Sequence, residues 1–170
     1  RSTLGRYYVY NRADNTLVLL SKDWIQEPVF SPDGTKVAFV RENDIYYYDL
    51  LLEETIRVTE DGQKNKIING ITDWVYEEEF AFVRAFEWNA SSNKIAFIRF
   101  DETNVPQFSM DIYGTELYQT QEVFKYPKAG ETNAEVSLHF YDLNTDTISN
   151  VALSKNYNDF YISRIKWTKD

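Results

Sequence analysis

The chain has 170 residues, of which 43% are hydrophobic and 16% aromatic, so it can build one packed domain or a piece of a larger one. Its net charge of −9 argues against nucleic acid as a partner and favours cationic ligands. The absence of cysteine excludes disulfides and thiolate metal sites, and no apolar run approaches the ~18 residues of a membrane-spanning helix.

Aromatic and β-branched residues, separated by turn residues, predict short strands in the first third of the chain. We expect strands at residues 7–10, 16–20, 28–30, 37–40, 44–50 and 55–59. The first two form a hairpin across the turn at 11–15. The third ends in Ser31-Pro32-Asp33-Gly34, in which Pro32 fixes φ and Gly34 supplies the positive φ that such a turn often needs.

The pattern then recurs along the chain. The matching ranges are 28–40 with 86–98, 44–50 with 136–143, and 55–59 with 148–153. A third copy begins at residues 165–169. Phe30, Trp88 and Trp167 occupy equivalent places, and the two intervals between them are 58 and 79 residues. A four-stranded propeller blade takes ~40–50 residues, so both intervals contain an insertion.

The insertions lie at about residues 72–82 and 101–130. We therefore predict an all-β chain that forms a partial β-propeller, with about three blades' worth of four-stranded antiparallel sheets, a short helical insertion and a protruding β-hairpin arm. Residues 1–170 would be a fragment of one propeller domain. A β-sandwich is the alternative, although it does not require the recurrence. Because so few blades cannot close a ring, we expect open edges and either self-association or marginal stability.

The first insertion contains three consecutive carboxylates between aromatic residues, in the run Asp73-Trp74-Val75-Tyr76-Glu77-Glu78-Glu79-Phe80. Thr72 or Asp73 can cap one or two helical turns. Neighbouring residues on a helix point ~100° apart, so at most two of the carboxylates converge on one point. Two convergent carboxylates suit an ammonium group. The alternative is an acidic surface helix that Trp74 and Phe80 anchor.

Three blocks of the chain resemble one family of enzymes. The run Gly70–Glu79 is similar to the double-glutamate motif of the dipeptidyl peptidase IV family, in the prolyl oligopeptidase clan of serine peptidases. Tyr126–Gly130 followed by Asn144–Asp146 is similar to a second block, and Asn43–Tyr46 to a third and weaker one. The resemblance runs through essentially the whole chain, in order.

The resemblance implies an eight-bladed propeller joined to a C-terminal α/β-hydrolase domain, which together release N-terminal dipeptides with Pro or Ala as the second residue. It assigns the binding of the substrate's α-ammonium to Glu78 and Glu79, with Glu77 and Tyr76 as supporting residues. It also implies an arginine shortly before the strand at 7–10. Arg1 lies near that place, but its spacing is one residue short. The functional arginine can therefore lie upstream, with Arg1 in a disordered terminus.

The second insertion holds many apolar side chains within residues 104–128. A solvent-exposed arm of this kind usually packs on something. The resemblance implies contacts in a homodimer, whereas the alternative is an arm folded back onto its own blade.

Two further features, a calcium-like run and the single histidine, do not predict a functional site. The run Asp142–Asp146 begins like a calcium loop, but Thr147 and Leu153 stand where glycine and glutamate are expected, so we predict a hairpin turn and no metal site. His139 lies within a predicted strand without a partner cysteine or histidine, which favours a structural role.

No G-x-S-x-G elbow, P-loop or dinucleotide-binding glycine pattern is present in the sequence. We therefore expect no cofactor, a catalytic α/β-hydrolase domain outside this chain, and no peptidase activity from the chain alone. The chain begins without a visible signal peptide, as we expect of a processed or trimmed chain. The resemblance implies a periplasmic or cell-surface setting. The alternative function is that of a non-catalytic propeller binding module from an inactive relative.

Overall fold

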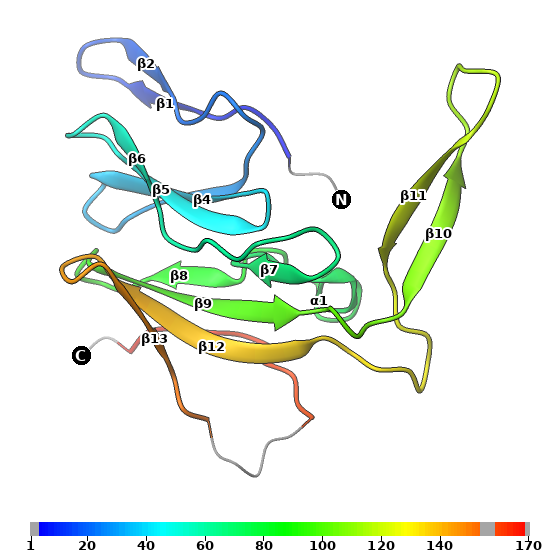
Figure 1. Cartoon of the computed structure of the whole chain (residues 1–170). Coiled ribbons are helices and arrows are strands. Elements are labelled where there is room, and N and C mark those ends of the chain that lie inside the picture. The colour runs from blue at the N-terminus through cyan, green and yellow to red at the C-terminus, as the bar shows by residue number, and fades with distance from the viewer. Residues whose placement is uncertain (1–3, 154–158, 169–170) are drawn as a thin grey trace.

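A computed structural model of the chain describes residues 4–153 and 159–168, and its antiparallel sheets are stacked face to face (Figure 1). The first part of the chain holds β1 (Tyr8–Asn11), β2 (Thr16–Leu19), β3 (Gln26–Phe30), β4 (Lys36–Arg41), β5 (Asp44–Asp49) and β6 (Glu54–Arg57). β1 and β2 form a hairpin, and β3 to β6 form a four-stranded sheet in sequence order. These six strands confirm the predicted positions of the hairpin and the first blade.

The second blade is interrupted by both insertions. Its elements and those of the insertions are β7 (Ile67–Asn69), α1 (Trp74–Glu79), β8 (Phe86–Trp88), β9 (Lys94–Asp101), β10 (Gln107–Ile112), β11 (Thr120–Lys125), β12 (Glu135–Asp142) and β13 (Thr147–Asn150). The order β13-β12-β9-β7 makes the sheet, and β8 also pairs with β9. β7 pairs with residues 99–101 and β8 with residues 95–97, so one edge of the sheet is built from two short strands.

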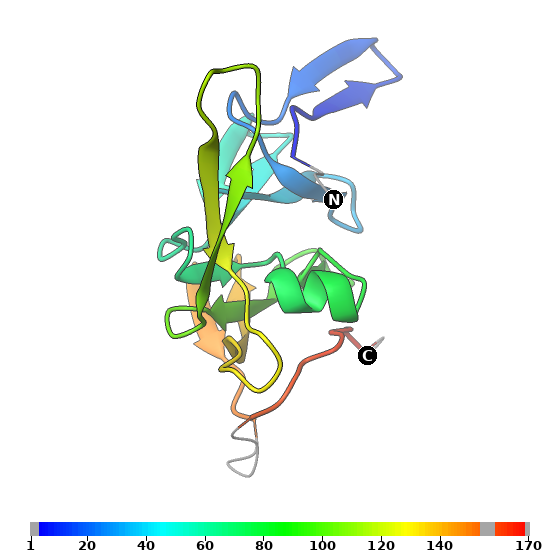
Figure 2. The ribbon, with the colours of Figure 1, turned by 90° about the vertical axis from the view of Figure 1, so that its right-hand side faces the viewer.

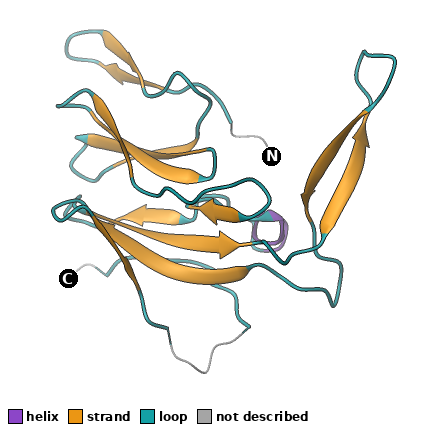
Figure 3. Cartoon of the chain, viewed as in Figure 1, coloured by secondary structure: helices purple, strands orange, loops and turns teal. Residues whose placement is uncertain are grey.

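The helix α1 lies between these two half-strands in sequence, and Figure 3 shows it as a short helix among strands. The prediction did not include β7. Its three residues, Ile-Ile-Asn, are too few to show an alternating pattern. The predicted strand at 148–153 is also shorter in the structure, although Val151 N–H still donates to Leu138 O at 2.8 Å.

The blades repeat in their contacts as well as in their sequence. Trp88 Nε1 donates to the carbonyl of Val29, and Trp167 Nε1 donates to the carbonyl of Glu87, at 3.3 and 2.9 Å. Val29 and Glu87 directly precede Phe30 and Trp88, so each tryptophan makes the same contact with the preceding copy. Residues 165–168 therefore follow the second blade as a third copy would, although the described part of that segment forms no strand. Lys169 lies outside the described residues.

The main core lies between the two blades. Buried side chains from both sheets meet there, and Tyr47 of β5 packs its ring against the rings of Trp88 and Tyr141 at 6.2 and 6.5 Å. The fold-class prediction of a partial, unclosed β-propeller with a helical insertion and a hairpin arm is confirmed. Within residues 4–153 and 159–168, no helix has the length and apolar character needed to cross a membrane.

Candidate functional site

The loop that carries α1 is closed at its base by backbone hydrogen bonds. Thr72 N–H donates to Val83 O at 3.0 Å, and Ala85 N–H donates to Gly70 O at 2.8 Å. Gly70 has φ of +77°, and a Cβ there would lie 2.6 Å from Cγ1 of Ile45. Glycine is therefore required both for the backbone conformation and for the close approach to the first blade.

The helix begins at the predicted cap. Asp73 has an extended backbone, and its Oδ1 accepts a hydrogen bond from Tyr76 N–H at 3.0 Å. Of the two predicted candidates, Asp73 rather than Thr72 is the N-cap, because Thr72 Oγ1 instead donates to Phe82 O. Burial raises the pKa of Asp73 above its ordinary value. The cap is thus a carboxyl group held inside the protein, where it orients the first turn of α1.

Tyr76 anchors the buried side of α1. It is 1% exposed, and its ring contacts the rings of four other aromatic residues, namely Phe80, Phe82, Phe100 and Tyr161. Its hydroxyl accepts the N–H of Ile162 at 2.8 Å, and burial raises its pKa to about 12. Figure 2 shows the C-terminal segment, which supplies Tyr161 and Ile162, running next to α1. Because Tyr76 is buried, it can support a site on α1 only by holding the helix in place.

The glutamates lie on the outer side of α1. Glu77 is half-buried, whereas Glu78 and Glu79 are exposed. Glu79 lines a groove of about 390 Å³ together with Trp74 and residues of the segment that follows the arm, whereas Glu78 is not among the lining residues. The structure thus places both carboxylates on one short, anchored helix, facing outward. Arg1 lies outside the described residues.

Sequence reasoning missed a buried carboxyl group next to this helix. Glu102 directly follows β9 and is only 6% exposed. Burial raises its pKa to about 7, with a further contribution from the charge of Asp73, while Lys125 acts in the opposite direction. No sequence signal marks Glu102, because its burial depends on the tertiary fold around the end of β9.

The arm is the antiparallel pair β10 and β11, in register from Gln107 opposite Lys125 to Ile112 opposite Thr120. Figure 1 shows it standing away from the stacked sheets. Its tip exposes Tyr113, Leu117 and Tyr118 by 80, 89 and 78%. The tip therefore does not fold back onto its own blade. The returning strand of the arm is formed by Thr120–Lys125.

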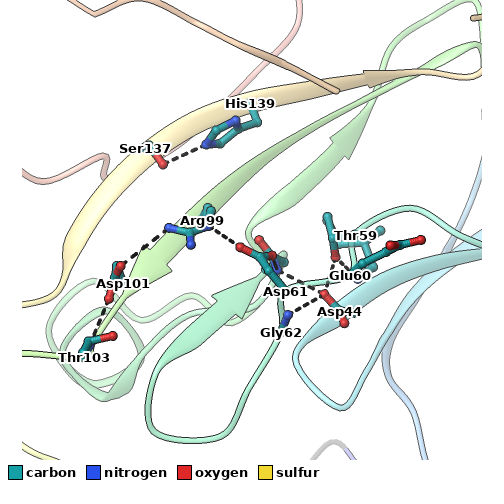
Figure 4. A network of polar contacts seen from close by, with 12 residues as sticks. Asp44, Thr59, Glu60, Asp61, Gly62, Arg99, Asp101, Thr103, Ser137 and His139 are labelled. Carbon is teal, nitrogen blue, oxygen red and sulfur yellow. Dashed lines mark hydrogen bonds and ion pairs between the residues drawn. The ribbon is translucent and has the colours of Figure 1, made fainter. Parts of the chain in front are cut away.

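A second polar cluster lies between the blades (Figure 4). Asp44 is 2% exposed and accepts hydrogen bonds from Thr59 Oγ1, Gly62 N–H and Arg57 Nη2 at 2.6, 3.0 and 2.6 Å. Asp44 therefore holds the start of β5 to the chain after β6. The block Asn43–Tyr46, the weakest part of the resemblance, contributes to this structural network.

His139 and Arg99 face the same inter-blade cavity, whose volume is about 630 Å³. His139 stacks on Phe97 at 5.4 Å, and its Nε2 lies 2.8 Å from Ser137 Oγ. Burial, and then the charge of Arg99, lower the pKa of His139. Arg99 is itself paired with Asp61 at 2.8 Å. These contacts agree with a structural role for His139.

The calcium-like run forms the predicted hairpin turn. β12 ends at Asp142, whose Oδ1 accepts Asn144 N–H at 2.9 Å, and β13 begins at Thr147. Asp146 accepts the hydroxyl of Tyr141 at 2.7 Å. In the part of the chain that the structure describes, no group of three or more His, Asp or Glu side chains could hold a metal ion.

Comparison with known proteins gives a consistent result. The family model for the dipeptidyl peptidase IV (DPP IV) N-terminal region matches residues 1–170. Dipeptidyl aminopeptidase B of Saccharomyces cerevisiae is 32% identical over 98% of this chain, and dipeptidyl-aminopeptidase B of Aspergillus niger is 33% identical over 93%. The crystal structure of Porphyromonas gingivalis dipeptidyl peptidase 4 covers all of this chain with a TM-score of 0.91 and 40% identity.

The chain spans only part of these proteins. It covers 21% of the yeast protein, 19% of the Aspergillus protein and 25% of the Porphyromonas chain. The likeness therefore concerns one region of much longer polypeptides.

Proposed function

The chain belongs to the dipeptidyl peptidase IV family, as part of its N-terminal region, and from this premise we propose that it recognises the free amino terminus of peptide substrates. The binding groups are Glu78 and Glu79. The observation that carries this proposal is the placement of two exposed carboxylates on a six-residue helix whose cap and inner face are buried.

The chemistry of an ammonium group suits this arrangement. An α-ammonium has three N–H donors and a full positive charge, so two carboxylates can satisfy most of its hydrogen bonds. Because Asp73 and Tyr76 hold the helix at its cap and inner face, the backbone that carries the carboxylates needs little reorganisation on binding. Glu77 and Tyr76 act as supporting residues, and Arg1 or an arginine before it would contact the substrate's carbonyl.

The parent protein would use this site to measure peptides. An ammonium fixed at Glu78 and Glu79 lets only the second peptide bond reach a nucleophile, so dipeptides with Pro or Ala in the second position are released. The nucleophile and its partners would lie in a C-terminal α/β-hydrolase domain, since this chain contains no G-x-S-x-G elbow. The chain alone would therefore be inactive, and the parent would work in the periplasm or at the cell surface.

The arm serves a second role in this proposal. Its exposed apolar tip supports contacts with another copy of the protein, because surface of this kind is stabilised by burial against a partner. A homodimer through residues 104–128 would place two recognition sites in one assembly.

The test uses the complete protein and a chromogenic X-Pro substrate, with a free or a blocked amino terminus. Glu78→Gln and Glu79→Gln should each lower kcat/KM for the free substrate by about tenfold to a hundredfold, because each removes a charge-assisted hydrogen bond. Glu54→Gln, an exposed carboxylate on β6, is the matched control and should leave kcat/KM unchanged.

Two results would count against the proposal. If either variant on α1 kept the kcat/KM of the parent, the assigned carboxylate would not bind the ammonium. If the complete protein hydrolysed neither substrate, the chain would belong to a non-catalytic binding module instead.

A further inference from the structure

The cavity between the two blades contains a buried hydrogen-bond acceptor without a donor. Asn69, the last residue of β7, is fully buried and lines this cavity. Its Nδ2 donates to Asp61 Oδ1 at 2.8 Å and to Asp44 Oδ1 at 3.1 Å. Because only the amide nitrogen can donate to two carboxylates, these contacts fix the orientation of the amide. Its Oδ1 then has no hydrogen-bond partner among the described residues.

An acceptor in this position favours a bound donor. A buried polar atom without a partner is unfavourable, so a group that supplies the missing hydrogen bond is bound with a gain in free energy. The cavity has a volume of about 630 Å³. This lies within the ~300–1,000 Å³ of small-molecule sites and far exceeds the ~30 Å³ that one water molecule takes up. The cavity beside Asn69 therefore has room for a small organic molecule.

The charges in the wall of the cavity nearly cancel. In the described part of the chain, two arginines and three carboxylates line it, namely Arg57, Arg99, Glu60, Asp61 and Asp146. Arg99 Nε is paired with Asp61 Oδ2 at 2.8 Å, and Arg57 Nη2 is paired with Oδ2 of the adjacent Asp44 at 2.6 Å. The wall therefore offers both donors and acceptors without a strong net charge.

This mixture argues against an ionic ligand. A carboxylate has no hydrogen to donate to Asn69 and would face three carboxylates. An ammonium group can donate, but both arginines repel it, and the wall has little net charge to offset the loss of its hydration. A hydroxyl group donates and accepts without carrying a charge. The remaining side chains suit the carbon frame between hydroxyls, since they include Val58, Phe97, His139, Tyr141 and Ile148.

We propose that the inter-blade cavity binds a neutral sugar ring, with one hydroxyl donating to Asn69 Oδ1, other hydroxyls accepting from Arg99, and the ring carbons against the apolar wall. Figure 4 shows the polar groups together, with Arg99 and His139 on one blade and Asp44 on the other. None of the lining residues belongs to α1, so this inference does not depend on the proposed function.

The experiment titrates the complete protein with D-glucose, D-galactose and D-mannose, and saturation-transfer NMR measures binding. Galactose and mannose each differ from glucose in the orientation of one hydroxyl. At least one of the three should bind saturably, with a dissociation constant of ~1 mM, as for a small ligand held by a few hydrogen bonds. Acetate and methylammonium are the charged comparison probes and should bind more weakly than that sugar.

A blocking variant locates the bound sugar. Ile148 lines the cavity and is 45% exposed, so Ile148→Trp should fill the mouth and raise the dissociation constant at least about tenfold. Leu52→Trp is the matched control, because Leu52 is 67% exposed in the turn between β5 and β6, and it should leave the constant unchanged. Should Ile148→Trp fail to fold, Arg99→Gln replaces it and should weaken binding about tenfold through the loss of charge-assisted donors.

Deoxy analogues of the sugar that binds best test the contact with Asn69. Removal of the hydroxyl that donates to Oδ1 leaves the acceptor unpaired again, so one analogue should bind at least about tenfold more weakly than the parent sugar. The inference is overturned if no sugar binds saturably up to about 50 mM, well above the expected dissociation constant. It is equally overturned by unchanged binding to the blocking variant, by equal affinity of all deoxy analogues, or by tighter binding of acetate or methylammonium.

Discussion

The two insertions of the second blade are built in opposite ways. The α1 loop buries its cap and its anchoring tyrosine and exposes two carboxylates, whereas the arm leaves apolar side chains exposed at its tip. An anchored helix that carries charged groups is suited to a small, charged ligand, since its backbone is already in place. A long hairpin with an apolar tip is suited to another protein surface.

Because the two insertions are built differently, substitutions at different kinds of residue should abolish the proposed role of each one. In the proposed function, binding at α1 would depend on residues behind the carboxylates as well, because Asp73 and Tyr76 set the direction of the helix. Contacts of the arm with a second copy would depend instead on the exposed residues themselves. Substitutions of the same kind should therefore lower stability strongly in the α1 loop and hardly at all at the tip of the arm.

The largest effect on stability is expected at Tyr76. Tyr76→Ala should lower the free energy of unfolding of the chain by about 4 kcal/mol, because it empties the centre of the aromatic cluster. Tyr76→Phe should cost only about 1 kcal/mol, the value of the hydrogen bond from Ile162 N–H. Urea unfolding followed by tryptophan fluorescence measures both.

The matched control for this prediction is Tyr113→Ala on the arm, where the side chain is 80% exposed. Its cost should be within about 0.5 kcal/mol, as at most surface positions. Similar losses at Tyr76 and Tyr113 would show that the two insertions are not anchored differently.

Glu102 gives the next largest effect, and it depends on pH. Its pKa in the folded chain is about 7 against an ordinary value of 4.5, so folding favours the protonated form. The contribution of Glu102 to the free energy of unfolding is therefore complete below pH 4.5 and is lost as the pH rises through about 7. The loss is ~3 kcal/mol at most. Glu102→Gln should remove that dependence.

The measurement is the difference in unfolding free energy between Glu102→Gln and the parent chain, at pH 5 and pH 8. The unfolding free energy of the variant should rise relative to that of the parent as the pH rises. Ionisations common to both proteins cancel in the difference. A difference that stays constant with pH would show that folding does not raise the pKa of Glu102.

Local sequence signals were enough to predict α1 and most of the strands. Asp73 as a cap and the acidic run after it indicated the helix, and the turn beginning at Ser31 and its counterpart at Asn89 indicated the blades. Both turns close with an equivalent backbone hydrogen bond, from Ser31 N–H to Lys36 O in one and from Asn89 N–H to Lys94 O in the other. Such features depend on a few neighbouring residues and can therefore be recognised in the sequence.

Features that depend on distant contacts could not be predicted. β7 is a strand only because β9 lies beside it, and its three residues carry no pattern of their own. Glu102 is an ordinary charged residue in sequence, and only the tertiary fold makes it a buried acid. The exposed positions of Glu78 and Glu79 also follow from the burial of Tyr76, not from the acidic run itself.

The smallest effect on stability, and the largest on assembly, is expected at the tip of the arm. Leu117→Ser should change the free energy of unfolding by less than about 0.5 kcal/mol, because 89% of the side chain is already exposed. If the tip is buried against a second copy, the same change should raise the dimer dissociation constant of the complete protein by about tenfold, as for one apolar contact. Sedimentation equilibrium measures this constant. Leu52→Ser, in the exposed turn between β5 and β6, is the control and should leave it unchanged. Equal weakening by both variants would mean that exposed leucines in general, rather than the arm, hold the copies together.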